Sequence, residues 1–219
     1  DHIREAATFN GDLKDVQRPW MLKAILGRVP PGSRILEIGA GEPFIADVLQ
    51  RLGYEVWIVD PYDGSGNGPE EYDRFLRCCP KLHFIRAQFD DKLDLPKDRF
   101  DCIYSVSVLE HIPPDLLPGV FRGLRKFLKL DGVSVHAVDH VHRGNGNQQH
   151  LDNLRRIVRG FGLPEPELDS MLARMTDDTD TYYLSAESHN RWRGGRSYAS
   201  FPMRVCISIN LVAERKHMG

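Results

Sequence analysis

The sequence predicts an α/β fold, in which a doubly wound and mostly parallel sheet carries helices on both faces. Short apolar runs and helical patterns alternate through residues 1–160. Glycines follow the first of these runs, Arg34–Ile38, and an acid, Asp60, follows the second, Glu55–Val59. Strand patterns that alternate with helical ones are typical of a parallel sheet with crossover helices. Glycines and an acid at the carboxyl ends of such strands indicate a ligand site there.

The first expected element is a helix from Arg18 to Arg28, which ends before Pro30-Pro31-Gly32 because proline and glycine do not continue a helix. The strand candidates are short, mostly apolar runs between turn residues. They are Arg34–Ile38, Glu55–Val59, Leu82–Ala87, Asp101–Val106 and Gly132–Val138. The helices expected between them are Pro43–Leu52, Pro69–Arg77 and Asp115–Leu130. The last helix is expected to stop at Asp131-Gly132, since glycine favours helix ends.

The chain beyond these strands is less regular. We expect a helix at Leu151–Phe161 and a shorter one near Glu167–Met175. Arg204–Glu214 alternates apolar and polar residues, which predicts an edge or antiparallel strand. Residues 161–202 show no strand–helix repeat, so we expect an elaborated insertion before the last strand.

The composition is that of an ordinary soluble globular protein. The 219 residues are 41% hydrophobic and 27% charged, enough for one large core. A net charge of -2 gives no general attraction to nucleic acid or to anionic membranes, so neither is expected as a partner. No apolar run could span a bilayer, and no signal-peptide pattern opens the sequence. The four cysteines lack zinc-binding spacing. Adjacent Cys78 and Cys79 rarely bridge each other, and Cys102 and Cys206 lie in strand-like runs, so we expect a reduced, cytoplasmic setting. The expected edge strand is compatible with a homodimer.

The loop after the first strand favours a cationic nucleoside over a dinucleotide. Gly39 and Gly41 allow the backbone to approach a ligand closely. A dinucleotide site needs a third glycine where this chain has Phe44. Glu37 and Glu42 on either side of the loop would repel a pyrophosphate but attract an ammonium and a sulfonium. We therefore expect S-adenosyl-L-methionine as the cofactor, with S-adenosyl-L-homocysteine as its product.

Plainer roles for these acids stay open. Asp60 stands where a carboxylate would accept hydrogen bonds from ribose hydroxyls, but Asp60-Pro61 is also a common turn. Both roles are compatible. Glu37 could instead cap backbone amides, in which case the glycines merely turn the chain.

Three motifs resemble those of the class I S-adenosylmethionine-dependent methyltransferases. They are Arg34-Ile-Leu-Glu-Ile-Gly-Ala-Gly41, Val59-Asp60 and Phe100-Asp-Cys-Ile-Tyr-Ser-Val-Ser-Val-Leu-Glu-His-Ile112. The resemblance implies a Rossmann-like fold with seven strands. It covers about residues 18–160 and returns at the final strand, and from the organisation of the chain we expect a single domain over residues 1–219. Its parts would be a cofactor-binding core at 18–160, a substrate-covering insertion at 161–202 and a last strand at 203–214.

The resemblance also implies which residues meet the cofactor. The glycine loop would border its methionine end, Asp60 its ribose, and Ser105 and Val106 would lie under the methionyl part. Where the family usually has an acid for the adenine amino group, this chain has Gln88, and Asp90 is the alternative. The expected cofactor-binding residues are Glu37, Gly39, Ala40, Gly41, Asp60, Pro61, Gln88, Phe89, Ser105 and Val106.

Methyl transfer to a hydroxyl needs a base beside the acceptor. His140, at the expected end of the fifth strand, is the first candidate, and His111, after the fourth strand, is the second. Asp139, His140 and His142 also suggest a divalent metal. However, neighbouring side chains of an extended strand point to opposite faces, so we expect no metal.

We therefore expect an enzyme, a methyltransferase acting on a small-molecule acceptor, most simply a hydroxyl of a sugar or natural product. The aromatic and arginine-rich segment 181–196 would help to cover that acceptor. Transfer to nitrogen or carbon of a small metabolite, and a non-catalytic member that binds the cofactor, are alternatives. A nicotinamide oxidoreductase is disfavoured by Phe44 and Glu37.

Overall fold

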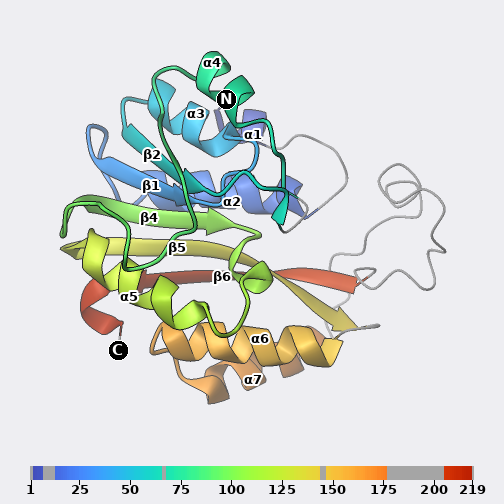
Figure 1. The fold of residues 1–219 in the computed structure, drawn as a ribbon. Helices are drawn as coiled ribbons and strands as arrows, with labels where there is room; N and C mark the ends of the chain where they lie inside the picture. Colours follow the sequence, from blue (N-terminus) through green and yellow to red (C-terminus); the bar gives the residue numbers. More distant parts are fainter. Residues whose placement is uncertain (1, 7–12, 66–67, 144–146, 177–204, 219) are drawn as a thin grey trace.

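The computed structural model describes residues 2–6, 13–65, 68–143, 147–176 and 205–218. Their strands form one sheet in the order β3-β2-β1-β4-β5-β6 (Figure 1). The strands are β1 (Arg34–Ile38), β2 (Glu55–Asp60), β3 (His83–Arg86), β4 (Phe100–Val106), β5 (Leu128–Arg143) and β6 (Val205–Glu214). Every neighbouring pair is parallel except β5 and β6, which confirms the α/β class and the antiparallel last strand.

Helices cover both faces of the sheet. They are α1 (His2–Ala6), α2 (Lys14–Leu26), α3 (Phe44–Arg51), α4 (Tyr72–Cys78), α5 (Leu117–Phe127), α6 (Asn147–Gly160) and α7 (Glu165–Thr176). Figure 1 shows α1 to α4 on one side and α5 to α7 on the other. The structure also contains two short 3-10 helices, η2 (Leu109–His111) and η5 (Arg215–His217). None of the described helices combines the length and apolarity needed to cross a membrane.

Alternate side chains of a strand are buried in two hydrophobic cores, one on each face of the sheet. Ile35 and Ile58 are buried in the core under α2 and α3, while Leu36 and Val59 are buried in the core under α5 and α6. Successive strand side chains point to opposite faces, so strands with both faces covered read as continuous apolar runs. This pattern is why the strands were visible in the sequence.

The described residues contain six strands, whereas the resemblance implies seven. The segment 177–204 between α7 and β6, which includes most of the expected insertion and the aromatic and arginine-rich stretch, lies outside the described residues.

Several expected boundaries were wrong. α2 begins at Lys14, four residues before the expected Arg18, because the carbonyl of Leu13 already accepts the first helical hydrogen bonds. α4 begins at Tyr72 rather than Pro69.

The junction between α5 and β5 also differs from the expectation. α5 ends at Phe127, and β5 starts at the next residue, Leu128. Asp131-Gly132 therefore lies inside β5, at a register irregularity, instead of ending the helix. The backbone amide of Arg99 donates to the Phe127 carbonyl, which fixes the end of α5 against the start of β4.

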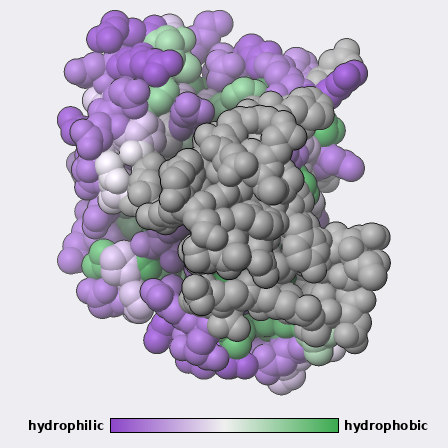
Figure 2. All heavy atoms as spheres, turned by 90° about the vertical axis from the view of Figure 1, so that its right-hand side faces the viewer, coloured by the Kyte–Doolittle hydropathy of each residue, from purple (hydrophilic) through white to green (hydrophobic). Residues whose placement is uncertain are grey.

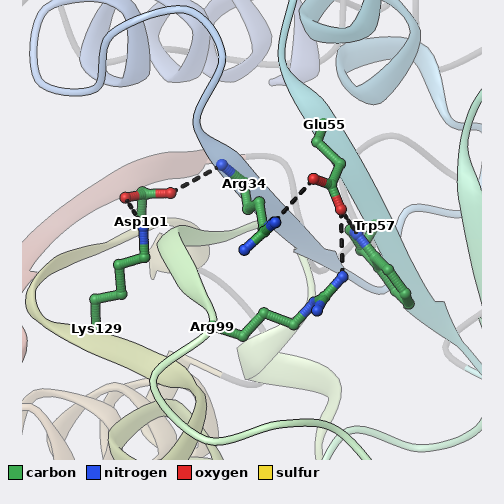
Figure 3. A network of polar contacts seen from close by, with 6 residues as sticks. All are labelled: Arg34, Glu55, Trp57, Arg99, Asp101 and Lys129. Atoms are coloured by element: carbon green, nitrogen blue, oxygen red, sulfur yellow. Dashed lines mark hydrogen bonds and ion pairs between the residues drawn. The ribbon is translucent and has the colours of Figure 1, made fainter.

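A polar network ties the amino ends of four strands together (Figure 3). The Glu55 carboxylate accepts hydrogen bonds from Arg34, Trp57 and Arg99 at 2.8, 3.0 and 3.3 Å. The Asp101 carboxylate accepts from the Arg34 amide at 2.9 Å and from Lys129 at 2.6 Å. Such partly exposed pairs each contribute little to stability. Their position leaves the opposite, carboxyl edge of the sheet open for a ligand site.

Candidate functional site

The strand order places the loops that follow β1 and β4 side by side. From β1 the chain proceeds outward through β2 and β3, and then it returns to β4 on the other side of β1. Ligands of open parallel sheets bind at such a switch point, beyond the carboxyl ends of the strands.

The glycine loop after β1 has the backbone that only glycine adopts without strain. Gly39 and Gly41 have φ of 63° and 54°. The Gly39 amide donates to the Val59 carbonyl of β2 at 2.9 Å. A Cβ at Gly39 would lie 2.8 Å from both methyl carbons of Val108, in the loop after β4. Glycine here lets the two loops approach each other.

Asp60, the last residue of β2, fixes the glycine loop from its other side. Its Oδ2 accepts a hydrogen bond from the Gly41 amide at 2.9 Å, and its Oδ1 accepts one from the Tyr62 amide at 2.7 Å. The structure thus shows the turn role of this residue. It also places Asp60 against the glycine loop, as expected for a ligand-binding carboxylate.

A cavity of about 810 Å³ lies at this edge of the sheet, within the usual size range of small-molecule sites. The expected cofactor and catalytic residues that line it are Gly39, Ala40, Gly41, Asp60, Pro61, Gln88, Phe89, Val106 and His111. Three expected residues, Glu37, Ser105 and His140, are not among its lining.

Figure 2 views the molecule from the side on which the arrows of β4 and β5 end in Figure 1. The described surface there is mostly hydrophilic, and its hydrophobic side chains form small, separate patches (Figure 2).

Glu37 lies beneath the glycine loop. Its side chain is buried against the Tyr104 hydroxyl and the Ala46 amide in the first turn of α3. Burial raises the pKa of the Glu37 carboxyl to about 8, although Tyr104 and the nearby Arg18 oppose the shift. This position agrees with the capping alternative, in which Glu37 supports the loop from below.

The residues after β3 form the next part of the cavity. Gln88 and Asp90 both line it, so the choice between them as adenine partner stays open. The Phe89 ring is buried and packs edge-on against the ring of Phe127, with the two ring centroids 6.0 Å apart. Gly123 of α5 lies against this segment, since a Cβ there would be 3.0 Å from both the Phe89 ring and the Asp90 backbone.

Ser105 points away from the cavity into the core under α6. Its hydroxyl forms a 2.7 Å hydrogen bond with Nδ1 of His136, whose Nε2 lies 2.6 Å from the Ser134 hydroxyl. Burial lowers the pKa of His136 to about 3, so this imidazole is neutral. The next residues, Val106 and Ser107, are the ones that line the cavity.

The two candidate bases lie in different surroundings. His111, in η2, is exposed to solvent and lines the cavity. Partial desolvation of the ring lowers the pKa of His111 from its ordinary value of 6.5. Asp139 opposes this shift, while His150 and Lys14 add to it. His140 is buried opposite Ile207 of β6, and β5 continues beyond it to Arg143. The expectation that His140 ends its strand was wrong.

The absence of a metal stays a prediction. Within the described residues, no group of three or more His, Cys, Asp or Glu is arranged to hold an ion. The side chain of His142 lies outside the description. Asp139 turns toward α2, where its Oδ1 accepts a 2.7 Å hydrogen bond from Gln17 Nε2.

Sequence reasoning missed a polar cluster that closes the site. The Ser107 hydroxyl lies 2.8 Å from Gln17 Oε1 and 2.9 Å from Asp139 Oδ1, so that α2, β4 and β5 meet there. Ser107 has a φ of 54°, a strained backbone of the kind that gathers at functional sites. The spacing of residues in α2 could have revealed Gln17. It stands four residues before Met21 and eight before Ile25, so it is a polar residue on the buried face of this helix.

Beside this cluster lies a second acid that the sequence did not single out. The buried carboxyl of Glu110 accepts a 2.8 Å hydrogen bond from the Asp139 amide. Burial raises the pKa of Glu110 well above its ordinary value, and the nearby Asp139 carboxylate adds to the shift.

Known proteins resemble this chain along most of its length. A protein-family model described as a methyltransferase domain matches residues 15–192. Protein-L-isoaspartate O-methyltransferase of Rhodopseudomonas palustris is 27% identical over 137 residues, or 62% of this chain and 55% of that protein. Ubiquinone biosynthesis O-methyltransferase of Xanthomonas campestris is 27% identical over 125 residues, or 52% of this chain and 47% of that protein.

A solved structure, an S-adenosylmethionine-dependent methyltransferase of Mesorhizobium loti, is 25% identical with a TM-score of 0.48, covering 60% of this chain and 57% of that one. The chain thus spans about half the length of these two curated relatives. It spans 39% of the length of a further curated relative, from Mycobacterium tuberculosis. The family model covers far more of the chain than any of these. This chain belongs to the methyltransferase domain family, within the class I S-adenosylmethionine-dependent methyltransferases, and its cofactor is S-adenosylmethionine.

Proposed function

We propose that this methyltransferase transfers a methyl group to a hydroxyl of a small polar acceptor, such as a sugar or a natural product. The observation that carries the proposal is the position of His111. This imidazole lines the same cavity as the glycine loop and Asp60, and its lowered pKa keeps it neutral near pH 7. A neutral imidazole at an acceptor site can remove the proton of a hydroxyl.

We assign the parts of the cofactor to the lining residues in the order in which these residues follow β1, β2, β3 and β4. We assign Gly39, Ala40 and Gly41 to the methionine end, since all three residues line the cavity beside Asp60. Asp60 and Pro61 would hold the ribose, Gln88 and Phe89 the adenine, and Val106 would lie under the methionyl part. When bound, S-adenosylmethionine supplies a methyl group that its sulfonium already activates.

The remaining chemistry belongs to the chain. His111 takes the hydroxyl proton, and Ser107 and Val108 shape the cavity wall between His111 and the glycine loop. Enclosure of the two reactants fixes the acceptor in line with the methyl group and excludes water. We favour His111 over His140 because His140 does not line the cavity.

The names of relatives support an oxygen acceptor, and the cavity supports one of small size. The two curated relatives described above carry names of O-methyltransferases, one acting in ubiquinone biosynthesis and one on protein L-isoaspartate. The cavity volume of about 810 Å³ is that of a small-molecule site. Transfer to an amine is the alternative, and it would need no base.

The direct test is methyl transfer from labelled S-adenosylmethionine to a panel of small alcohols, phenols, sugars, amines and carboxylic acids. We expect label in the hydroxyl compounds. Label in amines alone would overturn the assignment of the acceptor. A thermal-shift experiment accompanies it, in which S-adenosylmethionine and S-adenosylhomocysteine should raise the melting temperature and NAD should not.

The glycine loop gives a steric prediction. In Gly39→Ala the new methyl group would lie 2.8 Å from Val108, and the φ of 63° costs a non-glycine residue about 1–2 kcal/mol. We expect the affinity for S-adenosylhomocysteine, measured by calorimetry, to fall at least tenfold. Adding Val108→Ala removes the clash but not the backbone strain, so the double variant should recover part of the affinity.

Gly53→Ala is the matched control for this test. Gly53 also has a positive φ, 92°, but lies before β2, and a Cβ there would meet nothing within 4 Å. This variant should lose stability and keep normal affinity. Equal losses of affinity in both variants would show that the effect is general destabilisation rather than obstruction of the cavity.

A further inference from the structure

Asp139 lies behind the part of the cavity wall that carries His111. It belongs to β5, where the next residue, His140, is buried against β6. Because successive strand side chains point to opposite faces, the Asp139 side chain points the other way, toward α2. Asp139 is half-buried and is not among the residues that line the cavity. Any effect of Asp139 on a bound acceptor would therefore pass through its neighbours.

Asp139 contacts the wall segment Ser107–His111 near both of its ends. Its Oδ1 lies 2.9 Å from the Ser107 hydroxyl, and its backbone amide donates to Oε1 of Glu110 at 2.8 Å. The Ser107 amide in turn donates to the carbonyl of Ala137, two residues before Asp139 in β5, at 2.8 Å. The wall segment is thus held against β5 by three hydrogen bonds, and Asp139 takes part in two of them.

Gln17 of α2 holds the Asp139 carboxylate in place. It donates from Nε2 to Oδ1 of Asp139 at 2.7 Å, and none of its surface is exposed. Met21 and Ile25, on the same face of α2, are also fully buried, so the core fixes the rotation of this helix. The carboxylate therefore has a fixed position beside the segment Ser107–His111.

Three charged or titratable groups from neighbouring elements act on the His111 imidazole. Lys14 of α2 and His150 of α6 lower its pKa, whereas Asp139 of β5 raises it. Of these three groups, only Asp139 is an acid. A negative charge near an imidazole favours its protonated form, the imidazolium.

We propose that Asp139 is a positioning residue for His111, which holds the wall segment in place and stabilises the imidazolium with its negative charge. In the proposed reaction, the acceptor hydroxyl gives its proton to His111 as its oxygen forms the bond to the methyl carbon. The electron pair of the broken carbon–sulfur bond stays on sulfur. His111 then carries a positive charge close to Asp139 until it releases the proton to solvent. This inference rests on the proposed function, because it takes His111 as the base.

Asp139→Asn tests the charge separately from the shape. Asparagine keeps the size of the side chain and one oxygen for Gln17 and Ser107, and the backbone bond to Glu110 is unaffected. We expect kcat to fall about tenfold and the acid limb of kcat/KM to move to lower pH by about 0.5–1 unit. Affinity for S-adenosylhomocysteine in calorimetry should stay within twofold, which shows that the variant is folded.

A second measurement does not depend on turnover. The His111 ring can be titrated by NMR in the chain without ligands, and its signal is identified by its absence in His111→Ala. In Asp139→Asn the midpoint of this titration should move to lower pH, as the acid limb does. Loss of a merely structural contact would lower kcat at every pH and move neither midpoint.

Two control variants separate the charge of Asp139 from other effects. Asp131→Asn removes an exposed acid near the other end of β5, and it should leave turnover and both midpoints unchanged. Ser107→Ala removes the hydroxyl contact but keeps the charge, so both midpoints should stay near those of the wild-type chain. Adding Asp139→Asn to His111→Ala should lower turnover no further, because Asp139 acts through His111.

Unmoved midpoints in a folded Asp139→Asn variant would overturn this inference, whatever happens to kcat. A further loss of turnover in the double variant would also overturn it. Full turnover in His111→Ala would instead overturn the proposed function, and the NMR titration would still report on the charge of Asp139 at His111.

Discussion

Replacing Asp60 by alanine is expected to weaken the binding of S-adenosylmethionine more than a hundredfold. The Asp60 carboxylate accepts hydrogen bonds from the Gly41 and Tyr62 amides. Bonds to a charged group contribute about 1.5–3 kcal/mol each, so the variant loses the support of the glycine loop. It also loses the acceptor that we assign to the ribose hydroxyls. Calorimetry with S-adenosylhomocysteine measures the effect, and unchanged affinity would refute the assignment.

Two controls separate ribose binding from loop support. Asp63→Ala removes an exposed cavity acid whose carboxylate accepts a hydrogen bond from Ser65 in a neighbouring turn, and it should change affinity little. Asp60→Asn keeps one carbonyl oxygen and hence part of the loop support. The wild-type chain should prefer adenosine to 2′,3′-dideoxyadenosine, and Asp60→Asn should reduce that preference. A preference that survives the substitution would leave Asp60 with its loop role alone.

Replacing His111 by alanine is expected to lower turnover about 100-fold to 10,000-fold, the usual contribution of a general base. Cofactor affinity should stay within twofold, because His111 lies in η2, away from the glycine loop. The measurements are kcat from labelled-methyl transfer and affinity from calorimetry. His140→Ala is the comparison, and a folded His140→Ala variant should retain turnover. Loss of turnover in His140→Ala alone would instead identify His140 of β5 as the base.

The pH profile gives a second test of His111. Burial lowers the pKa of its imidazole below 6.5, Lys14 and His150 act in the same direction, and Asp139 opposes them. The neutral form, which accepts the proton, therefore predominates at pH 7. We expect kcat/KM to be level near pH 7 and to fall as the pH drops through the lowered pKa. His111→Ala should lack this acid limb, and a wild-type profile without one would argue for an amine acceptor.

Local patterns in the sequence predicted much of the fold. β1 begins and ends where expected, because Arg34–Ile38 is an apolar run closed by glycines. The antiparallel β6 was visible in the alternation of Val205–Glu214. The boundary between α5 and β5 was not, since Asp131-Gly132 looks like a helix stop while the pairing of Leu128 with Phe100 starts the strand earlier.

The candidate site was predictable only where neighbouring residues build it. The glycine loop and Asp60 lie in short motifs, and the structure brings them together. The cluster of Gln17, Ser107 and Asp139 joins residues 90 and 122 positions apart, which no local pattern reveals. The motifs also do not reveal which of their side chains line the cavity and which point into the core.

The bond between Gln17 and Asp139 has a thermodynamic consequence. It docks α2 onto the strand ends and so presents Lys14 and Arg18 to the cavity. A molecule that binds against these residues favours the docked helix over the detached one, by mass action. Occupancy of the cavity should therefore slow hydrogen exchange in α2, so that this helix reports on a ligand held at the carboxyl ends of the strands.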